Sequence, residues 1–220
     1  MMKTPQRALL VLMTLFALVG LSGCSTVYFN TMEKLGFEKR DLLVDRVEDT
    51  RDAQEEARET FRSSLERFQN AVATPDTELK ARYDDISDAY DDSMDAAENV
   101  RDRIDRVETV SEALFEEWED ELDQYESASL RQSSEEQLGE TRAQYEKLIN
   151  RMHEAEARME PVLDAFEDQV LYLKHNLNAQ AIGALENELG RISGDVDNLI
   201  RNMEASIAES ERFIRQFREQ

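Results

Sequence analysis

The chain has only one cysteine, three prolines, seven glycines and two histidines in 220 residues. A single cysteine excludes an internal disulfide, so the fold must be stabilised by packing alone. The shortage of proline and glycine, with an abundance of Glu, Arg, Ala, Leu and Gln, is typical of long helices. The sequence also lacks an HExxH motif, a phosphate-binding glycine loop and a G-x-S-x-G elbow, so we find no residues for an enzyme and no cofactor site.

Basic residues are scarce relative to acidic ones, with 26 Lys and Arg against 49 Asp and Glu and a net charge of −23. Nucleic acid is therefore excluded as a partner, because phosphate contacts need clustered cations. A mean hydropathy of −0.64 would by itself suggest disorder. The regular spacing of apolar residues described below indicates a folded, helical chain instead.

The one long apolar run, Ala8 to Val19, is too short to cross a bilayer of about 30 Å as a helix. Lys3 and Arg7 precede it and Leu21-Ser22-Gly23-Cys24 follows it, an arrangement that resembles a bacterial lipoprotein signal with its lipobox. In such lipoproteins the cysteine is lipidated and becomes the first residue, and several acyl chains anchor the protein stably. The alternatives are a transmembrane helix or a secretory signal with an incidental cysteine.

Ser25 follows the lipidated cysteine, where an aspartate would favour retention of a lipoprotein in the inner membrane. We therefore expect the outer membrane, with the protein facing the periplasm. The predicted organisation is a signal peptide over 1–23, a lipidated N-terminus and tether over 24–30, and a helical bundle domain over 31–220. Removing the signal leaves 24 basic and 49 acidic side chains, a net charge of −25.

Apolar residues recur at steps of three and four along four segments, the period of amphipathic helices in coiled coils. The first segment runs from about Thr31 to Ala73. Thr74-Pro75 then supplies an N-cap and a proline at the first helical position, starting a second helix of about 50 residues. Its seam is Leu79, Tyr83, Ile86, Tyr90, Met94, Ala97, Val100, Ile104, Val107, Ser111, Leu114, Trp118, Leu122 and Tyr125.

The third helix is expected after a polar loop, Ser127 to Ser134, because Ser133 and Glu136 have the spacing of a capping box. Pro161 should kink this helix without ending it. Lys174 and His175 suit its last turn, Asn176 the left-handed position after it, and Asn178 the N-cap of a fourth helix. The fourth seam runs through Leu185 and Met203 and then slips by one residue at Ile207.

The predicted fold is all-α: an elongated, antiparallel, coiled-coil four-helix bundle with up-down-up-down order. The anchor, the 127–134 loop and the C-terminus should lie at the membrane end. Thr74-Pro75 and the segment His175, Asn176 and Asn178 should form a distal tip, which is our candidate docking site. Hairpins pairing between chains would satisfy the same heptads, so a homo-oligomer stays open.

Five separated blocks resemble a family of uncharacterised bacterial lipoproteins catalogued as a domain of unknown function. The blocks are Glu38-Lys39-Arg40-Asp41, Val44 to Ala57, Leu114 to Glu119, Met159-Glu160-Pro161-Val162 and Leu173 to Asn178. The resemblance covers essentially all of the mature chain. It implies a location and a fold, and brings no activity, cofactor or catalytic residue.

Two acidic groups could hold divalent cations loosely, but helical carboxylates lack the loop that wraps calcium, so solvated faces are the simpler interpretation. They are Asp84, Asp88, Asp91, Asp92 and Asp95, and the cluster Glu116, Glu117, Glu119, Asp120, Glu121 and Asp123. His153 and His175 would lie about 33 Å apart on one helix, too far to share a metal. Trp118, Tyr90 and Phe166 fall on the seams and are expected in the core.

The function expected from these features is that of an outer-membrane-anchored, periplasm-facing lipoprotein acting as a spacer or protein-docking scaffold in the cell envelope. Its partners would be the membrane, through lipid on Cys24, and an envelope protein. The alternative is a regulatory subunit that activates or positions an envelope enzyme.

Overall fold

The computed structural model describes residues 39–73, 79–176 and 179–219, without the side chains of 179–184. All regular secondary structure within these ranges is α-helical. The helices are α3 (Lys39–Ala73), α4 (Leu79–Leu122), α5 (Ala128–Glu156), α6 (Met159–His175) and α7 (Ala179–Glu219). The predicted helix start at Thr31 and the Thr74-Pro75 cap lie outside the described residues.

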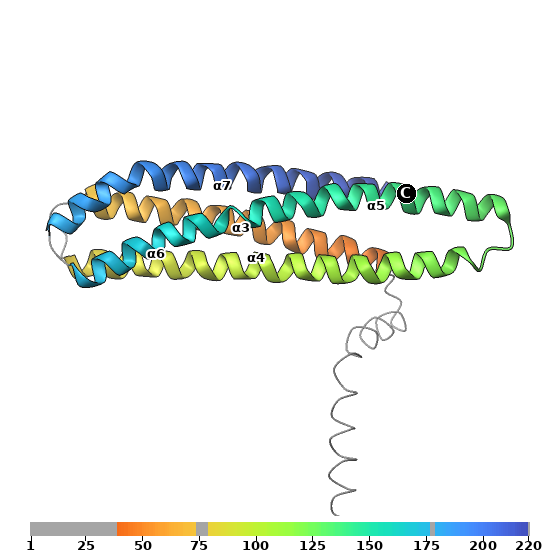
Figure 1. Ribbon diagram of the computed structural model, residues 1–220, viewed down its shortest axis with the longest axis horizontal. Helices are drawn as coiled ribbons and strands as arrows, with labels where there is room; N and C mark the ends of the chain where they lie inside the picture. The colour runs from red at the N-terminus through yellow and green to blue at the C-terminus, as the bar shows by residue number, and fades with distance from the viewer. Residues whose placement is uncertain (1–38, 74–78, 177–178, 220) are drawn as a thin grey trace, which may run out of the picture. The chain divides into compact units, whose positions relative to one another are not determined.

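Residues from Leu43 onward form a compact unit of their own. Within it, α3, α4, the pair α5 and α6, and α7 run side by side with alternating directions (Figure 1). Both α5 and α6 pack against α4 and α7. The predicted all-α, antiparallel four-helix bundle is thus confirmed, with α5 and α6 together forming its third rod. The 44 residues of α4 alone make a helix about 66 Å long.

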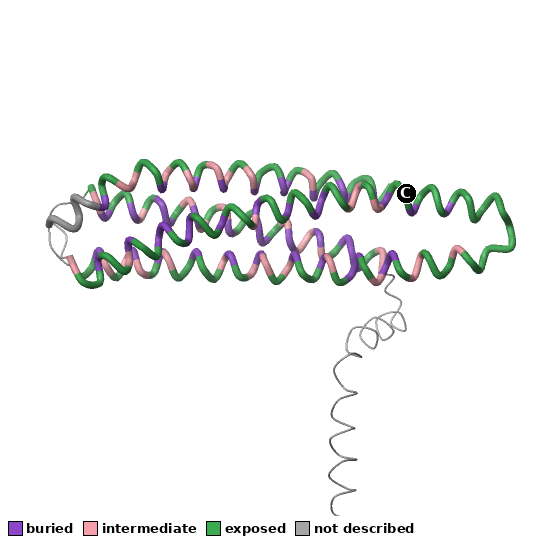
Figure 2. The backbone as a smooth tube through the Cα atoms, viewed as in Figure 1, coloured by how far each residue is buried: buried purple, intermediate pink, exposed green. Residues whose placement is uncertain are grey.

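The core is a seam of buried residues along the inward faces of the helices (Figure 2), and most of these residues are apolar. Phe61 and Phe68 of α3, Phe166 of α6, and Phe213 and Phe217 of α7 are among the largest wholly buried side chains. The rings of Phe68 and Phe166 stack with centroids 4.4 Å apart, which joins α3 to α6. The predicted slip in the last helix is not a shift of the seam. Ile207 and Ile214 are buried as expected, but Ser206 and Phe213, which keep the spacing that leads up to Met203, are buried as well, so the seam widens instead.

The seam of α4 differs from prediction near its middle. Met94, placed on the seam, is 42% exposed, while Ser93 is fully buried. The Ser93 hydroxyl donates to Ser64 Oγ at 2.8 Å, and Ser64 donates to the carbonyl oxygen of Ala89 at 2.9 Å. Small side chains let α3 and α4 approach closely here. A hydrogen-bonded serine pair therefore occupies the position that hydrophobicity alone assigned to methionine.

The turn between α4 and α5 is shorter than predicted. Helix α5 begins at Ala128, and Ser127 is its N-cap, accepting a hydrogen bond from the Leu130 N–H at 3.4 Å. The predicted loop over 127–134 and the Ser133–Glu136 capping box are therefore wrong. Ser134 lies buried inside the helix, because its hydroxyl accepts a hydrogen bond from Trp118 Nε1 of α4 at 2.8 Å.

Proline 161 marks a break rather than a bend. Helix α5 ends at Glu156 and α6 begins at Met159, with Pro161 as the third residue of α6. Proline has no N–H for the carbonyl four residues earlier, that of Ala157, and its ring crowds that carbonyl. The sequence therefore predicted the position of the irregularity correctly. The prediction that the helix continues through it is wrong, because α5 ends and α6 begins there.

The two ends of the bundle differ. The C-terminal ends of α3 and α6 and the N-terminal ends of α4 and α7 lie together at one end, as predicted for the tip (Figure 1). At the other end the α4–α5 hairpin continues past the C-terminus of α7 (Figure 1). The turn and the C-terminus thus lie on the same side, as expected, but they are not level. Cys24, where the anchor is predicted, lies outside the described residues.

Gln54 on α3 generates a prediction about stability. Its side chain is fully buried, and neither its Nε2 nor its Oε1 has a hydrogen-bond partner in the described part of the chain. An unpaired buried amide costs about 1–3 kcal/mol. Gln54→Met, which keeps the shape and removes the polar atoms, should therefore raise the melting temperature in calorimetry. Gln69→Met, at an exposed site on the same helix, serves as control and should change little.

A lower melting temperature for Gln54→Met than for wild type would contradict this account of Gln54. It would mean that the amide is hydrogen-bonded to water inside the folded bundle.

Candidate functional site

The predicted docking tip is formed by the end of α6. His175 is the last residue of this helix and is exposed. The backbone N–H of Asn176 donates to the Leu173 carbonyl at 3.1 Å, and Asn176 Nδ2 donates to the Tyr172 carbonyl at 3.0 Å. These bonds satisfy carbonyls that the helix end leaves open. The tip thus offers an exposed imidazole beside a helix end that is already capped.

The backbone of Asn176 corrects one prediction. Its φ of −130° and ψ of 53° are not left-handed. A left-handed residue is useful where backbone N–H groups must reach the last carbonyls of a helix. Here the side-chain amide reaches the Tyr172 carbonyl instead. Asn178, the third predicted tip residue, and Cys24, the predicted lipidation site, lie outside the described residues.

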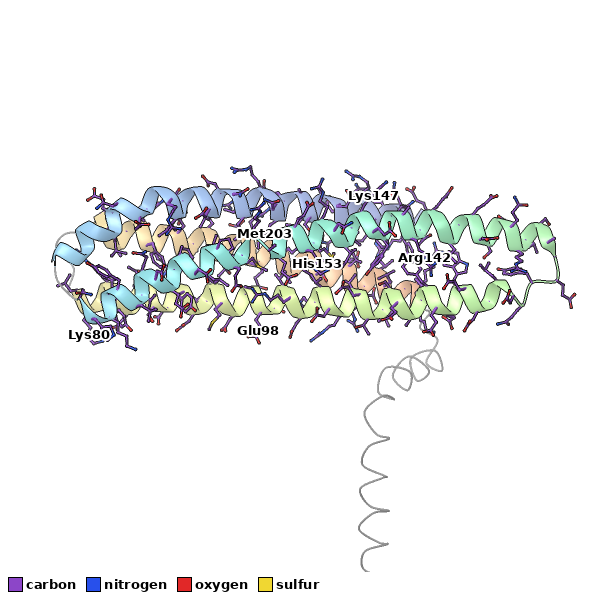
Figure 3. The ribbon with its side chains drawn as sticks, viewed as in Figure 1. Lys80, Glu98, Arg142, Lys147, His153 and Met203 are labelled. Carbon is purple, nitrogen blue, oxygen red and sulfur yellow. The ribbon has the colours of Figure 1, made fainter. Side chains whose placement is uncertain are left out.

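His153 occupies a charged cluster between α5 and α4 (Figure 3). Its Nε2 lies 3.0 Å from Glu108 Oε1 of α4, and its Nδ1 lies 3.0 Å from Glu156 Oε2 of α5. Partial burial by itself lowers the pKa of His153, but the hydrogen bonds to Glu156 and Glu108 raise it, and the net shift is upward. The i, i+3 spacing of His153 and Glu156 is visible in the sequence, whereas Glu108 lies 45 residues away.

The acidic stripe of α4 is an exposed and partly ion-paired surface. Asp84 accepts a hydrogen bond from Lys80 at 2.6 Å, and Arg67 of α3 bonds to Asp85 at 2.8 Å and Asp92 at 2.9 Å. In the second acidic cluster, Glu119 pairs with Arg142 and Asp123 with Arg131. Within the described helices, no three His, Cys, Asp or Glu side chains converge so as to hold a metal ion.

The aromatic residues predicted for the core behave differently along the bundle. Phe166 is fully buried, whereas Tyr90 and Trp118 are half-buried. Near the α4–α5 turn the two helices rely on aromatic contacts, with the Phe115 and Tyr145 rings edge to face at 5.4 Å. The Arg142 guanidinium lies over the Phe115 ring at 5.2 Å from its centroid. These rings pack the hairpin and form no ligand cage.

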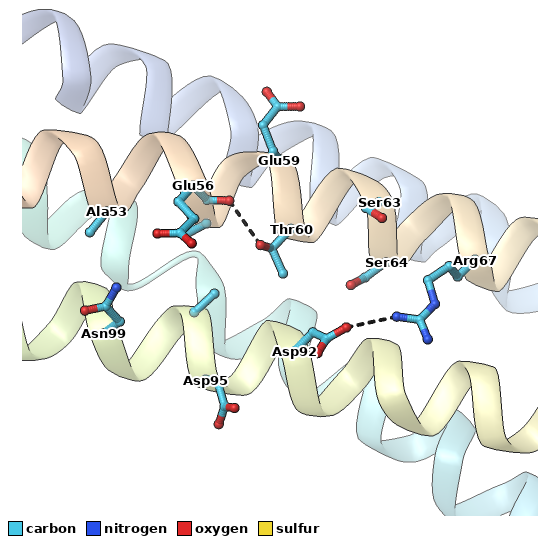
Figure 4. Close-up of a pocket in the computed structure, with 12 residues that line it drawn as sticks. Ala53, Glu56, Glu59, Thr60, Ser63, Ser64, Arg67, Asp92, Asp95 and Asn99 are labelled. Carbon is cyan, nitrogen blue, oxygen red and sulfur yellow. Dashed lines mark hydrogen bonds and ion pairs between the residues drawn. The ribbon is translucent and has the colours of Figure 1, made fainter.

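A groove of about 600 Å³ runs between α3 and α4 (Figure 4). It is lined by Ala53, Glu56, Ala57, Glu59, Thr60, Ser63, Ser64, Arg67, Asp92, Asp95, Ala96 and Asn99. Glu59 and Asp95 point away from the space between the helices, and Asp92 is bonded to Arg67 (Figure 4). The lining therefore supplies hydroxyl and amide groups, the Glu56 carboxylate and the Arg67 guanidinium, and it contains no histidine.

Comparison with known proteins identifies a family without an assigned activity. Residues 28–217 match the family model described as "Protein of unknown function (DUF2959)". No curated protein and no solved structure matches the chain. None of the described helices is both long and apolar enough to cross a membrane.

The excess of carboxylates generates a prediction about salt. With 49 acidic against 26 basic side chains, repulsion between acidic faces should weaken the bundle at low ionic strength. Raising sodium chloride from about 10 mM to about 150 mM shortens the Debye length from about 30 Å to about 8 Å. We expect the melting temperature to rise by about 2–4 °C, the shift produced by ~1 kcal/mol in a chain of this size.

Circular dichroism at 222 nm measures this transition, with sucrose in place of salt as the uncharged control. A melting temperature that falls as salt rises would show that the exposed ion pairs outweigh the repulsion, since salt weakens such pairs as well.

Proposed function

This chain belongs to the DUF2959 family, and from that premise we propose that it is a lipoprotein anchored in the outer membrane and facing the periplasm. Its helical bundle would act there as a spacer or as a docking scaffold for another envelope protein. Family membership supplies no activity, so the proposal rests on the residues of this chain.

The observation that carries the proposal is the combination of an anchor signature with a bundle of long helices and a charged surface. Leu21-Ser22-Gly23-Cys24 follows a short apolar run, and a multiply acylated cysteine holds a protein to a bilayer stably. The described helices expose carboxylates along their length and bury an apolar seam between them. A bundle of this kind could hold two envelope components apart, because its helices are long. It could also bind a partner protein through its charged, exposed surface.

The position after the predicted lipidation site supports the choice of membrane. Ser25 stands where an aspartate favours retention of lipoproteins in the inner membrane. The strongly acidic bundle is also suited to standing away from an anionic lipid surface, because like charges repel over about a Debye length.

The proposed anchor can be tested by removing the sulfur of Cys24. Cys24→Ser should leave the protein uncleaved or released from the membrane, since all stable membrane affinity is assigned to acyl chains on that sulfur. Membrane fractionation and the mass of the mature chain measure this. Ser22→Ala, which keeps a small residue beside the cleavage position, is the matched control and should be processed normally. Recovery of processed Cys24→Ser protein in the outer membrane would refute the anchor assignment.

The proposed docking tip can be tested at His175. His175→Ala should remove an exposed imidazole while changing stability by less than about 0.5 kcal/mol, as is usual at surface sites. If the tip is the docking surface, crosslinking in intact cells should recover fewer partners with His175→Ala than with wild type. Gln132→Ala, exposed on α5 far from the tip along the chain, is the control. An unchanged partner set with His175→Ala would exclude docking through this side chain.

A further inference from the structure

The junction between α5 and α6 is the one break within a rod of the bundle among the described residues. Ala157 and Arg158 lie between the two helices, and their N–H groups donate to the carbonyls of His153 at 2.9 Å and Ala155 at 3.1 Å. Pro161 cannot donate to the Ala157 carbonyl. The backbone is therefore held less firmly here than in a continuous helix, and side chains have to fix the angle between α5 and α6.

A chain of five charged or ionisable side chains spans this junction. Glu108 of α4 contacts His153, and His153 contacts Glu156 at the end of α5, each at 3.0 Å. Arg101 of α4 then reaches Glu156 at 3.7 Å and, beyond the break, Glu160 of α6 at 2.5 Å. Both sides of the junction are thereby tied to α4.

The position of the His153 ring between two carboxylates determines which contacts are attractive in each protonation state. A neutral imidazole has one N–H donor and one lone pair, so it can donate to only one of two carboxylates. With both ring nitrogens 3.0 Å from carboxylate oxygens, both contacts are attractive only if both nitrogens carry hydrogen. With His153 neutral, one of the two carboxylates faces a lone pair and that contact is lost.

We propose that the α5–α6 junction is a pH-responsive joint. The clasp of Glu108, His153 and Glu156 ties the end of α5 to α4 most firmly while both ring nitrogens of His153 carry hydrogen. When one ring nitrogen loses its hydrogen, His153 can donate to only one of the two carboxylates, so the clasp weakens and Arg101 carries a larger share of the tie to α4. The proposal does not depend on the lipid anchor or on the docking tip.

The surroundings of His153 support this behaviour. The charges acting on it come from Glu108 of α4 and Glu156 of α5, and both raise its pKa against the opposing effect of partial burial. Arg101 faces Glu156 from α4, and Glu160 faces Arg101 from α6. Arg151 and Glu154, its neighbours on α5, bond to each other. Although α7 also packs against α5, no charge of its described residues is among those that shift the pKa.

The direction of the pH effect follows from the raised pKa. A group whose folded-state pKa lies above its ordinary value of 6.5 stabilises the fold fully below that value. The contribution is lost as the pH rises through the folded-state pKa. The side chain of His153 is 44% exposed, so the effect should be local rather than global.

The test is hydrogen–deuterium exchange of the full-length chain in non-ionic detergent, at about pH 5.5 and about pH 8, on either side of the ordinary histidine pKa. Protection factors, corrected for the intrinsic exchange rate at each pH, are compared for the segment 153–160. Wild type should lose protection at least about threefold at the higher pH, the scale of one partly exposed ion pair. Segments in the core of α7 should not change.

Two variants and one control make the result specific. His153→Gln cannot be charged and should show low protection at both pH values. Glu108→Gln keeps a hydrogen-bonding side chain but removes the charge, and should reduce the pH dependence at least about twofold. His175→Gln changes the only other histidine and should behave as wild type. Equal protection of wild type at both pH values, or a pH dependence that survives in His153→Gln, would overturn the proposal.

Discussion

The bundle depends on the burial of one continuous apolar seam along antiparallel helices. A single cysteine allows no internal disulfide, so packing has to hold the chain together. The seam does so through large side chains at separated levels, such as Phe61 and Phe68 in α3, Phe166 in α6 and Phe217 in α7. Each wholly buried aromatic of this size contributes on the order of 2–3 kcal/mol. Because apolar residues recur at steps of three and four, each turn of a helix places another side chain on the buried face.

The surface follows from the same constraint. A long rod has a large area for its volume. The charged side chains include 49 acidic and 26 basic residues, and arginines bridge some of the carboxylates between helices. Individual exposed ion pairs contribute about 0–1 kcal/mol, so they add orientation more than stability. Such a surface leaves recognition to local features, because charge of one sign along the whole length does not by itself distinguish one site from another.

The α5–α6 junction is where the uniform rod becomes uneven. Proline at position 161 removes backbone support, and side chains from α4 supply it again through Arg101 and Glu108. A continuous helix would need no such contacts. Among the described residues, the bundle thus combines long continuous helices with one break inside a rod, where ionisable side chains tie the two helix ends to α4.

The sequence by itself determined the helical class, the number of rods and most of the seam, because apolar residues spaced by three and four define one face of a helix. It also located the weak point at Pro161 and the end of α6 at His175. It could not decide which residue of a neighbouring pair is buried, as at Ser93 and Met94. That choice depends on how closely another helix approaches, and hydrophobicity favours the wrong residue where a serine pair fits.

Only the tertiary structure decided the contacts between distant parts of the chain. Trp118 of α4 bonds to Ser134, which lies in a segment predicted as a loop but found in α5, and Glu108 of α4 contacts His153 of α5. Periodicity states which face of a helix is apolar, but it does not state which polar group of another helix lies opposite. The proposed lipobox, Leu21-Ser22-Gly23-Cys24, is the reverse case: it is proposed from a local pattern in the sequence, to which the helical period of the bundle adds nothing.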